Sequence, residues 1–509
     1  MSIPRIVQYN LVRILLRFSG EITIKKRRTR ARFLERLASN VQDALQTTGA
    51  PFALQKERSR LLVETESPEA LETLSRVFGV QTLSVVERRS FATLDDIVRI
   101  GTELYSNIVT GRRFAVRARR LASGKAFSFS SLDIERALGA ALSPYAASVD
   151  LEHPQLTIFV EVHSAGADFF TEKIAGPGGL PLGTAGRSLA LLSGGFDSAV
   201  ASWLMLKRGV ELEYLFCRLG GSLHEHGALR VAKVLADRWS YGSFPKLYAL
   251  DFEPVVAHLQ ERVEPRLWQV ILKRLMYRAA ENLAKRLHLL GIVTGESIGQ
   301  VSSQTLQNLA VISQASELPI WRPLVGLNKD EIIARARQIG TYKYSATVEE
   351  YCAILPKHPA TAASLKAVLA EEEKLNMGVL ERAFQNMRTY DLRRMELGAF
   401  EAPAIEIEEI PEGAVVIDLR SPQSYRAWHY PGALYKDFLT ALKEYPSWEK
   451  DKIYVLYCEV GLKSAHLAEK MRGDGFQAFH FKGGWPKLVQ YALERDLVPP
   501  EILPSSAWA

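Results

Sequence analysis

A short stretch near the middle of the chain, Ser188 to Gly209, narrows the range of possible folds more than any other part. Its apolar run, Leu189 to Leu192, has the length and composition of a buried parallel strand. The run ends at the turn SGGFDS, residues 193–198, and an apolar helical pattern follows as far as Gly209. A strand, a glycine turn and a helix N-terminus in this order direct free backbone N–H groups and the positive end of a helix at an anion.

The turn has the residue types of a phosphate site. Gly194 and Gly195 let the backbone approach an anion closely, and Ser193 and Ser198 add hydroxyl donors. Asp197 would repel a phosphate by itself, so its presence indicates a Mg²⁺ ion bound to that phosphate. The turn has no lysine of the Walker A type. The alternative is an ordinary βα turn rich in small residues; the complete SGGxDS pattern between strand and helix favours the anion site.

Length and composition predict a multidomain cytoplasmic protein. A chain of 509 residues is too long for one hydrophobic core, so we expect three or four domains. Hydrophobic residues make up 47% and charged residues 24%, as in soluble globular proteins, and no apolar run is long enough to span a membrane. The N-terminus lacks a secretion signal. Only three cysteines indicate a reducing compartment and not a disulfide scaffold.

The positive charge of the chain is concentrated in its first third. The net charge is +7, and residues 1–180 hold 25 Lys and Arg against 19 Asp and Glu. A solvated surface is the usual role of such runs, but two dense arginine-rich clusters favour a nucleic acid partner. The residues expected to contact RNA are Lys25, Lys26, Arg27, Arg28, Arg112, Arg113, Arg117, Arg119 and Arg120.

The segment that carries these clusters predicts two small α+β domains, at residues 1–70 and 71–175. LRFSGE at residues 16–21 precedes the first cluster, and the strand FAVRARR at residues 114–120 precedes a helix from Ser131 to Leu142. These features resemble the ferredoxin-like and THUMP domains found in tRNA-modifying enzymes. The resemblance implies that the basic faces hold RNA by its backbone and shape.

A Gly/Pro-rich hinge at residues 176–183 leads to a region in which strands alternate with helices. This alternation predicts a doubly wound parallel sheet, covered on both faces, at residues 184–395. Ligands of such sheets lie at the carboxyl ends of the strands. The loop at residues 295–305 follows the strand Gly291 to Thr294 and is therefore expected at the same edge as the SGGFDS turn. Residues 361–400 are expected to be helical and 401–412 to form a linker.

The SGGxDS turn and the segment TGESIGQVSSQT, residues 294–305, resemble the PP-loop ATP pyrophosphatases. That family cleaves ATP between its α- and β-phosphates and leaves AMP on a substrate oxygen. The resemblance suggests Lys329 as a catalytic cation, with an ordinary residue near a helix start as the alternative. The resemblance also suggests that Lys273 contacts ATP, and the alternative is a solvated lysine on a helix. The implied ATP contacts are Leu191, Leu192, Ser193, Gly194, Gly195, Asp197, Ser198, Lys273, Gly295 and Gln304, and Asp197 is the implied Mg²⁺ ligand.

Two of the three cysteines are candidates for sulfur chemistry. Cys458 ends an apolar strand and opens the loop CEVGLKS before a helix, where N–H groups and the helix dipole favour a thiolate. Glu459 opposes this effect and Lys463 partly compensates it; an inert core cysteine is the alternative. Cys352 lies in a polar segment and is either a redox partner or an incidental surface thiol. Cys217 is expected to be a packing residue.

Residues 410–500 resemble a rhodanese domain, a small α/β unit that carries sulfane sulfur as a cysteine persulfide. The resemblance depends on VIDLR at residues 416–420, HYPGA at 429–433, the Cys458 loop and GGW at 483–485.

The order of these parts over nearly the whole chain resembles the tRNA 4-thiouridine synthase (ThiI) family. The resemblance implies that ATP adenylates O4 of uridine 8 in tRNA, that a cysteine desulfurase loads Cys458 with a persulfide, and that Cys352 and Cys458 then form a disulfide which a cellular thiol reductant resets. The same family supplies sulfur for the thiazole of thiamine, through a sulfur-carrier protein. A carrier that serves thiamine synthesis alone and a non-catalytic RNA-binding protein are the alternatives, and a homodimer is left open.

Overall fold

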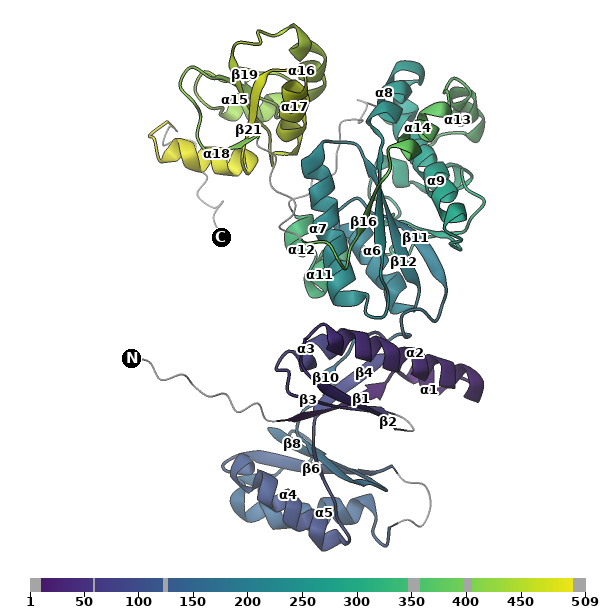
Figure 1. Ribbon diagram of the computed structural model, residues 1–509. Helices are drawn as coiled ribbons and strands as arrows, with labels where there is room; N and C mark the ends of the chain where they lie inside the picture. The colour runs from purple at the N-terminus through teal and green to yellow at the C-terminus, as the bar shows by residue number, and fades with distance from the viewer. Residues whose placement is uncertain (1–10, 58–59, 122–126, 347–357, 397–404, 498–509) are drawn as a thin grey trace. The chain divides into compact units, whose positions relative to one another are not determined.

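The computed structural model describes residues 11–57, 60–121, 127–346, 358–396 and 405–497. The chain divides into two compact units, of which the first comprises the residues up to Thr184 with 207–209 and 241–243, and the second the remainder. Each unit contains two sheets, drawn with their labels in Figure 1. In the described part of the chain, every helix is too short or too polar to cross a membrane.

The first sheet of the first unit has the strand order β10-β4-β1-β3-β2, with antiparallel neighbours. Its core packs Leu16 of β1 and Val63 of β3 against Leu37 of α2. We expected this domain to end at residue 70, but β4 pairs with β1 in the same sheet, which therefore runs to Val85. The elements are β1 (Val12–Phe18), α1 (Gly20–Thr23), α2 (Arg27–Gln46), β2 (Phe52–Lys56), β3 (Arg60–Thr65), α3 (Ala70–Leu74), β4 (Val80–Val85) and β10 (Ile174–Ala175).

The second sheet of the first unit has the order β5-β9-β8-β6-β7 and is covered by two helices. Both helices begin at a capping box, formed by Thr93 with Asp96 and by Ser130 with Asp133, which satisfies the first free N–H groups of each helix. The basic strand β6 runs parallel to β8, as far as Arg120. The elements are β5 (Glu87–Arg89), α4 (Leu94–Val109), β6 (Arg113–Arg120), α5 (Ser131–Leu142), β7 (Ser148–Val149), β8 (Leu156–His163) and β9 (Gly166–Phe170).

The second unit contains a six-stranded sheet of order β15-β14-β11-β12-β13-β16, whose first five strands are parallel. The predicted doubly wound parallel sheet is therefore confirmed. The chain moves from β11 to β12 on one side and later returns to β14 on the other, so the strand order reverses beside β11. Ligands bind at such a reversal point, outside the carboxyl ends of the strands. The strands are β11 (Arg187–Leu191), β12 (Glu211–Arg218), β13 (Lys246–Asp251), β14 (Ile292–Val293), β15 (Ile320–Trp321) and β16 (Arg388–Asp391).

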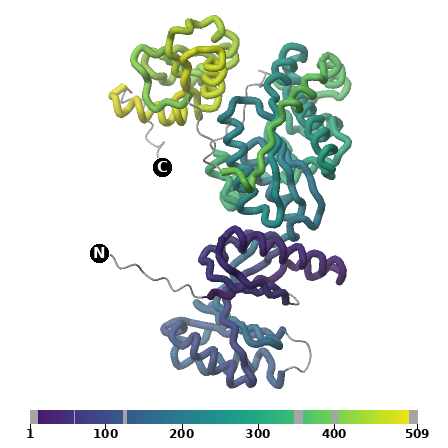
Figure 2. The backbone as a smooth tube through the Cα atoms, in the orientation of Figure 1, coloured from purple at the N-terminus to yellow at the C-terminus, as the bar shows by residue number. Residues whose placement is uncertain are grey.

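The sixth strand corrects the expectation that residues 361–400 are helical. The segment contains α13 (Leu365–Glu372) and α14 (Gly378–Gln385), but then β16 pairs antiparallel with the edge strand β13. Figure 2 shows this green segment returning along the teal sheet. A strand of four residues is too short to have a recognisable period, and its pairing with a distant edge decides its conformation.

Helices on both faces of this sheet connect its strands and carry several of the predicted site residues. The helices are α6 (Phe196–Lys207), α7 (Ser222–Trp239), α8 (Glu253–Arg262), α9 (Trp268–Arg286), α10 (Leu306–Ser313), α11 (Lys329–Ile339) and α12 (Tyr342–Ser345).

The last sheet is parallel throughout, with the order β17-β21-β20-β18-β19. Its central strand β20 leads through Cys458 into α17. The elements are β17 (Glu406–Ile407), β18 (Val415–Asp418), α15 (Pro422–Ala427), β19 (Leu434–Tyr435), α16 (Phe438–Glu444), β20 (Ile453–Tyr457), α17 (Leu462–Gly473), β21 (Gln477–Phe481) and α18 (Gly484–Leu493).

Candidate active site

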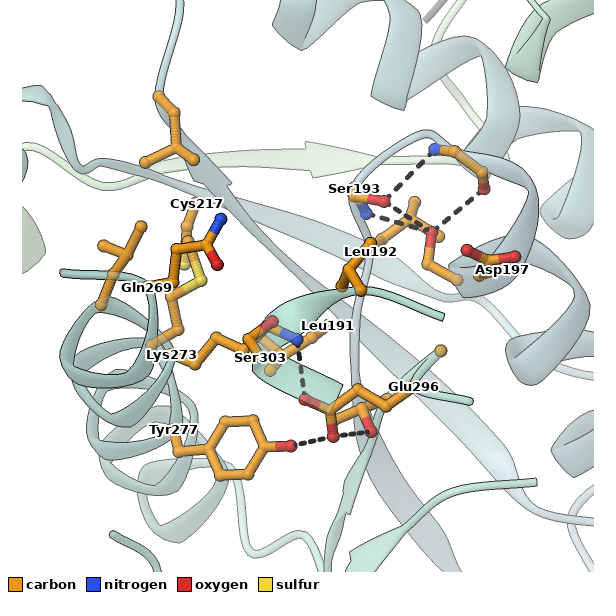
Figure 3. Close-up of a pocket in the computed structure, with 18 of the residues that line it drawn as sticks. Leu191, Leu192, Ser193, Asp197, Cys217, Gln269, Lys273, Tyr277, Glu296 and Ser303 are labelled. Atoms are coloured by element: carbon orange, nitrogen blue, oxygen red, sulfur yellow. Dashed lines mark hydrogen bonds and ion pairs between the residues drawn. The ribbon is translucent and has the colours of Figure 1, made fainter. Parts of the chain in front are cut away.

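A cavity of about 360 Å³ lies at the carboxyl ends of β11, β12 and β14. The SGGFDS turn, the end of β12, one face of α9 and the loop after β14 contribute its walls (Figure 3). Gly194 is not among the lining residues, although it belongs to the turn. The structure brings the other predicted nucleotide contacts together there, namely Leu191, Leu192, Ser193, Gly195, Asp197, Ser198, Lys273, Gly295 and Gln304.

The turn is held in shape by its own hydroxyl groups. Gly194 has φ +82°, a conformation that favours glycine. The Ser193 N–H donates to Ser198 Oγ at 3.1 Å, and the Gly195 N–H donates to Ser193 Oγ at 3.3 Å. Helix α6 begins directly after these residues, at Phe196. The turn therefore presents two hydroxyls at a helix N-terminus, the arrangement that binds phosphate groups.

The loop after β14 touches the backbone of the turn. A Cβ atom at Gly295 would lie 2.6 Å from the carbonyl carbon of Asp197 and 2.6 Å from the amide nitrogen of Ser198. No real Cβ atom tolerates such a distance, so this close approach requires glycine at position 295.

Asp197 contacts side chains from two segments that are distant from it in the sequence. Lys329, the first residue of α11, places Nζ 2.9 Å and 3.0 Å from the two carboxylate oxygens of Asp197. Gln300, in the loop after β14, donates from Nε2 to Asp197 Oδ2 at 2.9 Å. Lys329, the predicted catalytic cation, thus lies at the turn that is predicted to bind phosphate. The sequence had not indicated Gln300 as a residue of this site.

A buried carboxylate, Glu296, fixes the lysine that faces the cavity. Glu296 accepts hydrogen bonds from Lys273 Nζ at 3.0 Å, Tyr277 OH at 2.6 Å and Arg322 Nε at 2.7 Å (Figure 3 shows the first two). Burial by itself would raise the pKa of Glu296, but Lys273 and Arg322 outweigh it and hold that pKa at about 2. The residue stays ionised and keeps Lys273 in one position.

Sequence reasoning missed Glu296, Tyr277 and Arg322 as members of this site. Glu296 follows the strand at Val293 by three residues, and a carboxylate just beyond the carboxyl end of a parallel strand was the available signal. Tyr277 and Arg322 carry no such signal in the sequence. Their contact with Glu296 depends on where α9 and the end of β15 lie in the folded protein.

The other wall of the cavity is apolar, with Phe216, Leu272 and Met276 among its residues. Cys217 also lines it, and burial raises the pKa of this thiol, so it stays protonated as a packing residue. Gln304 is buried, and its Oε1 accepts no hydrogen bond within the described residues. An apolar slot with one free amide oxygen fits a flat aromatic ring that carries an N–H donor.

Cys458 lies between β20 and α17, as the strand and helix pattern predicted, but only 1% of it is exposed. Its Sγ accepts hydrogen bonds from the Gly461 N–H at 3.2 Å and from Ser464 Oγ at 3.5 Å. These donors suit a sulfur anion. Glu459, expected to oppose a thiolate, instead accepts a hydrogen bond from Ser424 Oγ at 3.0 Å. Almost no part of the Cys458 side chain is therefore in contact with solvent.

Cys352 and the disulfide expected of it lie outside the described residues. The disulfide therefore remains a prediction.

The basic residues of the first unit differ in whether their side chains are simply exposed or already bonded within their own domain. At the start of α2, Lys26, Arg27 and Arg28 are exposed. On and beside β6, Arg112 and Arg119 are exposed as well. Arg113 forms an ion pair with Asp150 at 3.0 Å, while Arg117 and Arg120 donate to the backbone carbonyls of Leu151 and Phe129. The last three thus stabilise their own domain in addition to any role in RNA binding.

Family models match the chain in four successive parts. The ThiI ferredoxin-like domain matches residues 13–84, the THUMP domain 91–171, the thiamine biosynthesis protein (ThiI) model 183–377 and the rhodanese-like domain 405–490. The multidomain α/β fold class expected from the sequence is therefore confirmed.

Curated relatives and solved structures agree with this assignment. The tRNA sulfurtransferase of Pyrobaculum aerophilum is 38% identical over 466 residues, which cover 91% of this chain and 95% of the relative. That of Desulfurococcus amylolyticus is 39% identical, with 92% and 97% covered. A crystal structure of a 4-thiouridine synthetase–RNA complex with bound ATP has 29% identity and a TM-score of 0.66, and covers 75% of this chain and 99% of its own. The chain therefore belongs to the tRNA sulfurtransferase (ThiI) family.

Proposed function

We propose that this protein uses ATP to adenylate O4 of uridine 8 in tRNA and then replaces that oxygen with sulfur carried by Cys458. The observation that carries the proposal is the cavity at the SGGFDS turn, where Asp197 and Lys329 meet at its phosphate side and Gln304 and apolar residues form the other wall. The solved relative with bound ATP supports the choice of nucleotide.

The cavity accommodates the two chemically different ends of ATP. The adenine ring fits the apolar wall, and its N6 amino group would supply the hydrogen bond that the buried Gln304 Oε1 lacks within the described residues. The phosphates then reach the N-terminus of α6 and the hydroxyls of Ser193 and Ser198. Lys273, oriented by Glu296, adds a positive charge at the cavity.

Asp197 is the residue that would hold a Mg²⁺ ion. In the described part of the chain no three His, Cys, Asp or Glu side chains form a metal site by themselves. A single carboxylate nevertheless suits Mg²⁺, which takes one or two carboxylates together with substrate phosphates. Bound there, the ion would neutralise charge on the phosphates. Lys329 must then share Asp197 or turn toward the phosphates.

Adenylation needs an oxygen nucleophile in line with the leaving pyrophosphate. Uridine O4 bonds to the α-phosphorus, the bond to the β-phosphate oxygen breaks, and the N3 proton of the base is released. Lys329 lies at the turn, where it can stabilise the negative charge that develops on the transferred phosphoryl group. The product is an O4-adenylated uridine whose AMP is a good leaving group.

Sulfur enters in the second half of the reaction. A cysteine desulfurase loads Cys458 as a persulfide, whose outer sulfur replaces AMP at C4 directly or after release as sulfide. In the direct route the outer sulfur bonds to C4 as AMP leaves, and the thiol of Cys352 then attacks Sγ of Cys458 and breaks its bond to the transferred sulfur, which stays on the base as 4-thiouridine. In the other route Cys352 attacks Sγ first and releases the outer sulfur as sulfide, which then displaces AMP from C4. Both routes leave Cys352 and Cys458 as a disulfide, as the family resemblance implies. A cellular thiol reductant supplies the two electrons that restore both thiols.

The exposed basic residues of the first unit would hold the tRNA. Lys26, Arg27, Arg28, Arg112 and Arg119 are free to contact phosphates, which position an RNA without reading its sequence.

A sulfur carrier for thiamine synthesis is the second candidate function, favoured by the family model described as a thiamine biosynthesis protein. The Cys458 persulfide would serve a sulfur-carrier protein in the same way. Deletion of residues 1–180 separates the two roles, because thiazole synthesis should survive it and tRNA thiolation should not.

The proposal is tested by incubating the protein with tRNA, ATP and Mg²⁺ and separating the nucleotide products. AMP and pyrophosphate are expected, and ADP would contradict the proposal. Mass spectrometry of tRNA from cells that carry Cys458→Ala should show no 4-thiouridine, and an undiminished level would remove Cys458 from the pathway.

A further inference from the structure

Two loops at the mouth of the cavity are fastened to each other. The N–H of Ile298, in the loop after β14, donates to the carbonyl of Val325, after β15, at 3.3 Å. Ser297 Oγ donates to the Leu327 carbonyl at 2.8 Å. These bonds hold the two loops side by side at the same edge of the sheet as Asp197.

The joined loops expose apolar side chains at this position. Ile298 is 46% exposed and Val325 is 42% exposed. Val301, in the same loop as Ile298, is 41% exposed and lines the cavity, whereas Ile298 and Val325 lie outside its lining. Exposed apolar groups at the rim of a catalytic cavity indicate a ligand that covers them.

Gln300 lies between Ile298 and Val301 in the sequence and is oriented by Asp197. A carboxylate only accepts hydrogen bonds, so the side that Gln300 turns toward Asp197 must be its NH₂ group, with Nε2 at 2.9 Å from Oδ2. The opposite atom, Oε1, is thereby fixed as an acceptor.

We propose that Ile298 and Val325 bind the face of the target uracil and that Gln300 Oε1 accepts a hydrogen bond from its N3–H. The inference rests on the proposed function. O4 is adjacent to N3 in uracil, and Gln300 and Lys329 contact the same carboxylate, so a base read by Gln300 places O4 beside Lys329 and the turn. Cytosine has an acceptor at N3 and would face the Gln300 oxygen without a hydrogen bond.

A flipped base is the occupant that this chemistry requires. The base of a folded tRNA must leave its stack before a protein can act on it, and such enzymes hold the extruded base by apolar contact and by hydrogen bonds to its Watson–Crick edge. The exposed pair Ile298 and Val325 offers the first kind of contact, and Gln300 offers the second.

Photocrosslinking of the full-length protein tests the site directly. The probes are tRNAs that carry 5-iodouridine or 5-iodocytidine at the target position. With the wild-type protein, 5-iodouridine should crosslink to peptides containing residues 295–301 or 322–328, about tenfold more than 5-iodocytidine, the ratio expected when one base-edge hydrogen bond is lost. Crosslinks to other segments, or equal yields for the two bases, would overturn the proposal.

Substitutions then separate the two contacts. Ile298→Ser with Val325→Ser should lower the single-turnover rate of tRNA-dependent AMP formation by about tenfold, because the apolar contact that holds the extruded base is lost. The dissociation constants for ATP and for whole tRNA should stay within twofold. Gln300→Met should abolish the preference for 5-iodouridine over 5-iodocytidine. An unchanged rate or an unchanged preference would contradict the corresponding contact.

A matched control is available before the other end of β14. Leu290 is 66% exposed and precedes β14, whereas Ile298 follows it, so the two lie at opposite ends of the strand. Leu290→Ser should leave the rate unchanged. If the double serine variant loses ATP binding, Ile298→Ala with Val325→Ala replaces it. Absence of AMP formation by the wild-type protein would refute the proposed function itself, whereas normal AMP formation with insensitive variants would refute only this base site.

Discussion

Lys329 Nζ lies within 3.0 Å of both carboxylate oxygens of Asp197, although 132 residues separate the two in sequence. The contact joins the N-terminus of α11 to the N-terminus of α6. The contact thus joins Lys329, the candidate transition-state cation, to Asp197, the candidate magnesium ligand. The pair is partly exposed, so we expect it to contribute little to the stability of the fold.

Replacement of this lysine should therefore separate activity from stability. Lys329→Ala should reduce the rate of AMP formation by about 10²–10³, the usual cost of removing one group that stabilises transition-state charge. The free energy of unfolding should change by less than about 1 kcal/mol, because exposed ion pairs contribute little. Single-turnover kinetics and thermal unfolding measure the two effects. Lys374→Ala, which removes another exposed ion pair, should change neither.

Gly295 offers a purely steric test. Gly295→Ala would push a Cβ atom against the Asp197 and Ser198 backbone at 2.6 Å and displace the phosphate turn. We expect the affinity for ATP, measured by equilibrium binding, to fall by at least about tenfold. Gly326→Ala has open space around its Cβ and should bind ATP normally. Normal ATP binding by Gly295→Ala would show that nucleotide binding does not depend on this turn.

Glu296 makes the stability of the second unit sensitive to acid. Its pKa in the folded protein is about 2, below its ordinary value of 4.5, because of Lys273 and Arg322. Such a carboxylate stabilises the fold above its ordinary pKa, and this contribution disappears as the pH falls toward 2. Glu296→Gln leaves two half-buried cations, Lys273 and Arg322, without their buried carboxylate partner and should cost about 3–5 kcal/mol at pH 7.

Denaturant unfolding across the pH range checks this expectation. The difference between the wild type and Glu296→Gln should be constant above about pH 5, because the carboxyl is then ionised in both the folded and unfolded states. It should shrink between pH 4.5 and 2. Glu317→Gln, at a fully exposed carboxylate, is the control and should show a much smaller difference. A difference that stays constant down to pH 2 would argue against an ionised Glu296.

Gly484 should control the shape of the Cys458 loop. A Cβ atom at Gly484 would lie 2.7 Å from the Gly461 nitrogen and 2.8 Å from the Cys458 carbonyl oxygen. Gly461 supplies the N–H that donates to Sγ, so Gly484→Ala should disturb that donor. We expect sulfur transfer to tRNA to fall by at least about tenfold, since one hydrogen bond to an anion is lost. AMP formation should remain normal, and Gly473→Ala is the control in open space.

The basic residues at the start of α2 predict a change in salt dependence. If Lys26, Arg27 and Arg28 contact phosphates, their replacement by Ala should weaken tRNA binding. The slope of log affinity against log salt concentration should become shallower by about 0.7–0.9 for each lost contact. Filter binding at several salt concentrations measures this slope. Lys56→Ala, which breaks an exposed pair with Glu35, should leave the slope unchanged.

Features that depend on neighbouring residues could be predicted from the sequence. The strands at Val415–Asp418, Ile453–Tyr457 and Lys246–Asp251 have the expected bounds, because apolar runs between turn residues define them locally. The sequence also predicted that the SGGFDS turn and the loop at residues 295–305 lie at the same edge of the sheet, because the carboxyl ends of parallel strands share one edge.

Features that depend on distant pairing could not be predicted. Strand β16 is a strand only because the edge of β13 accepts it, and β4 belongs to the first sheet because β1 lies beside it. The burial of Cys458 likewise follows from the approach of Gly484 and Trp485, which a strand–cysteine–helix pattern does not reveal.

By itself the sequence determined the family and predicted the phosphate turn and the reactive cysteine, because each is encoded in a short run of residues whose chemistry is local. Only the tertiary structure decided that Gln300 and Lys329 meet at Asp197, and that Lys273, Tyr277 and Arg322 surround Glu296. These contacts join separate loops and helices, and their partners are set by how the sheet and its helices pack in three dimensions.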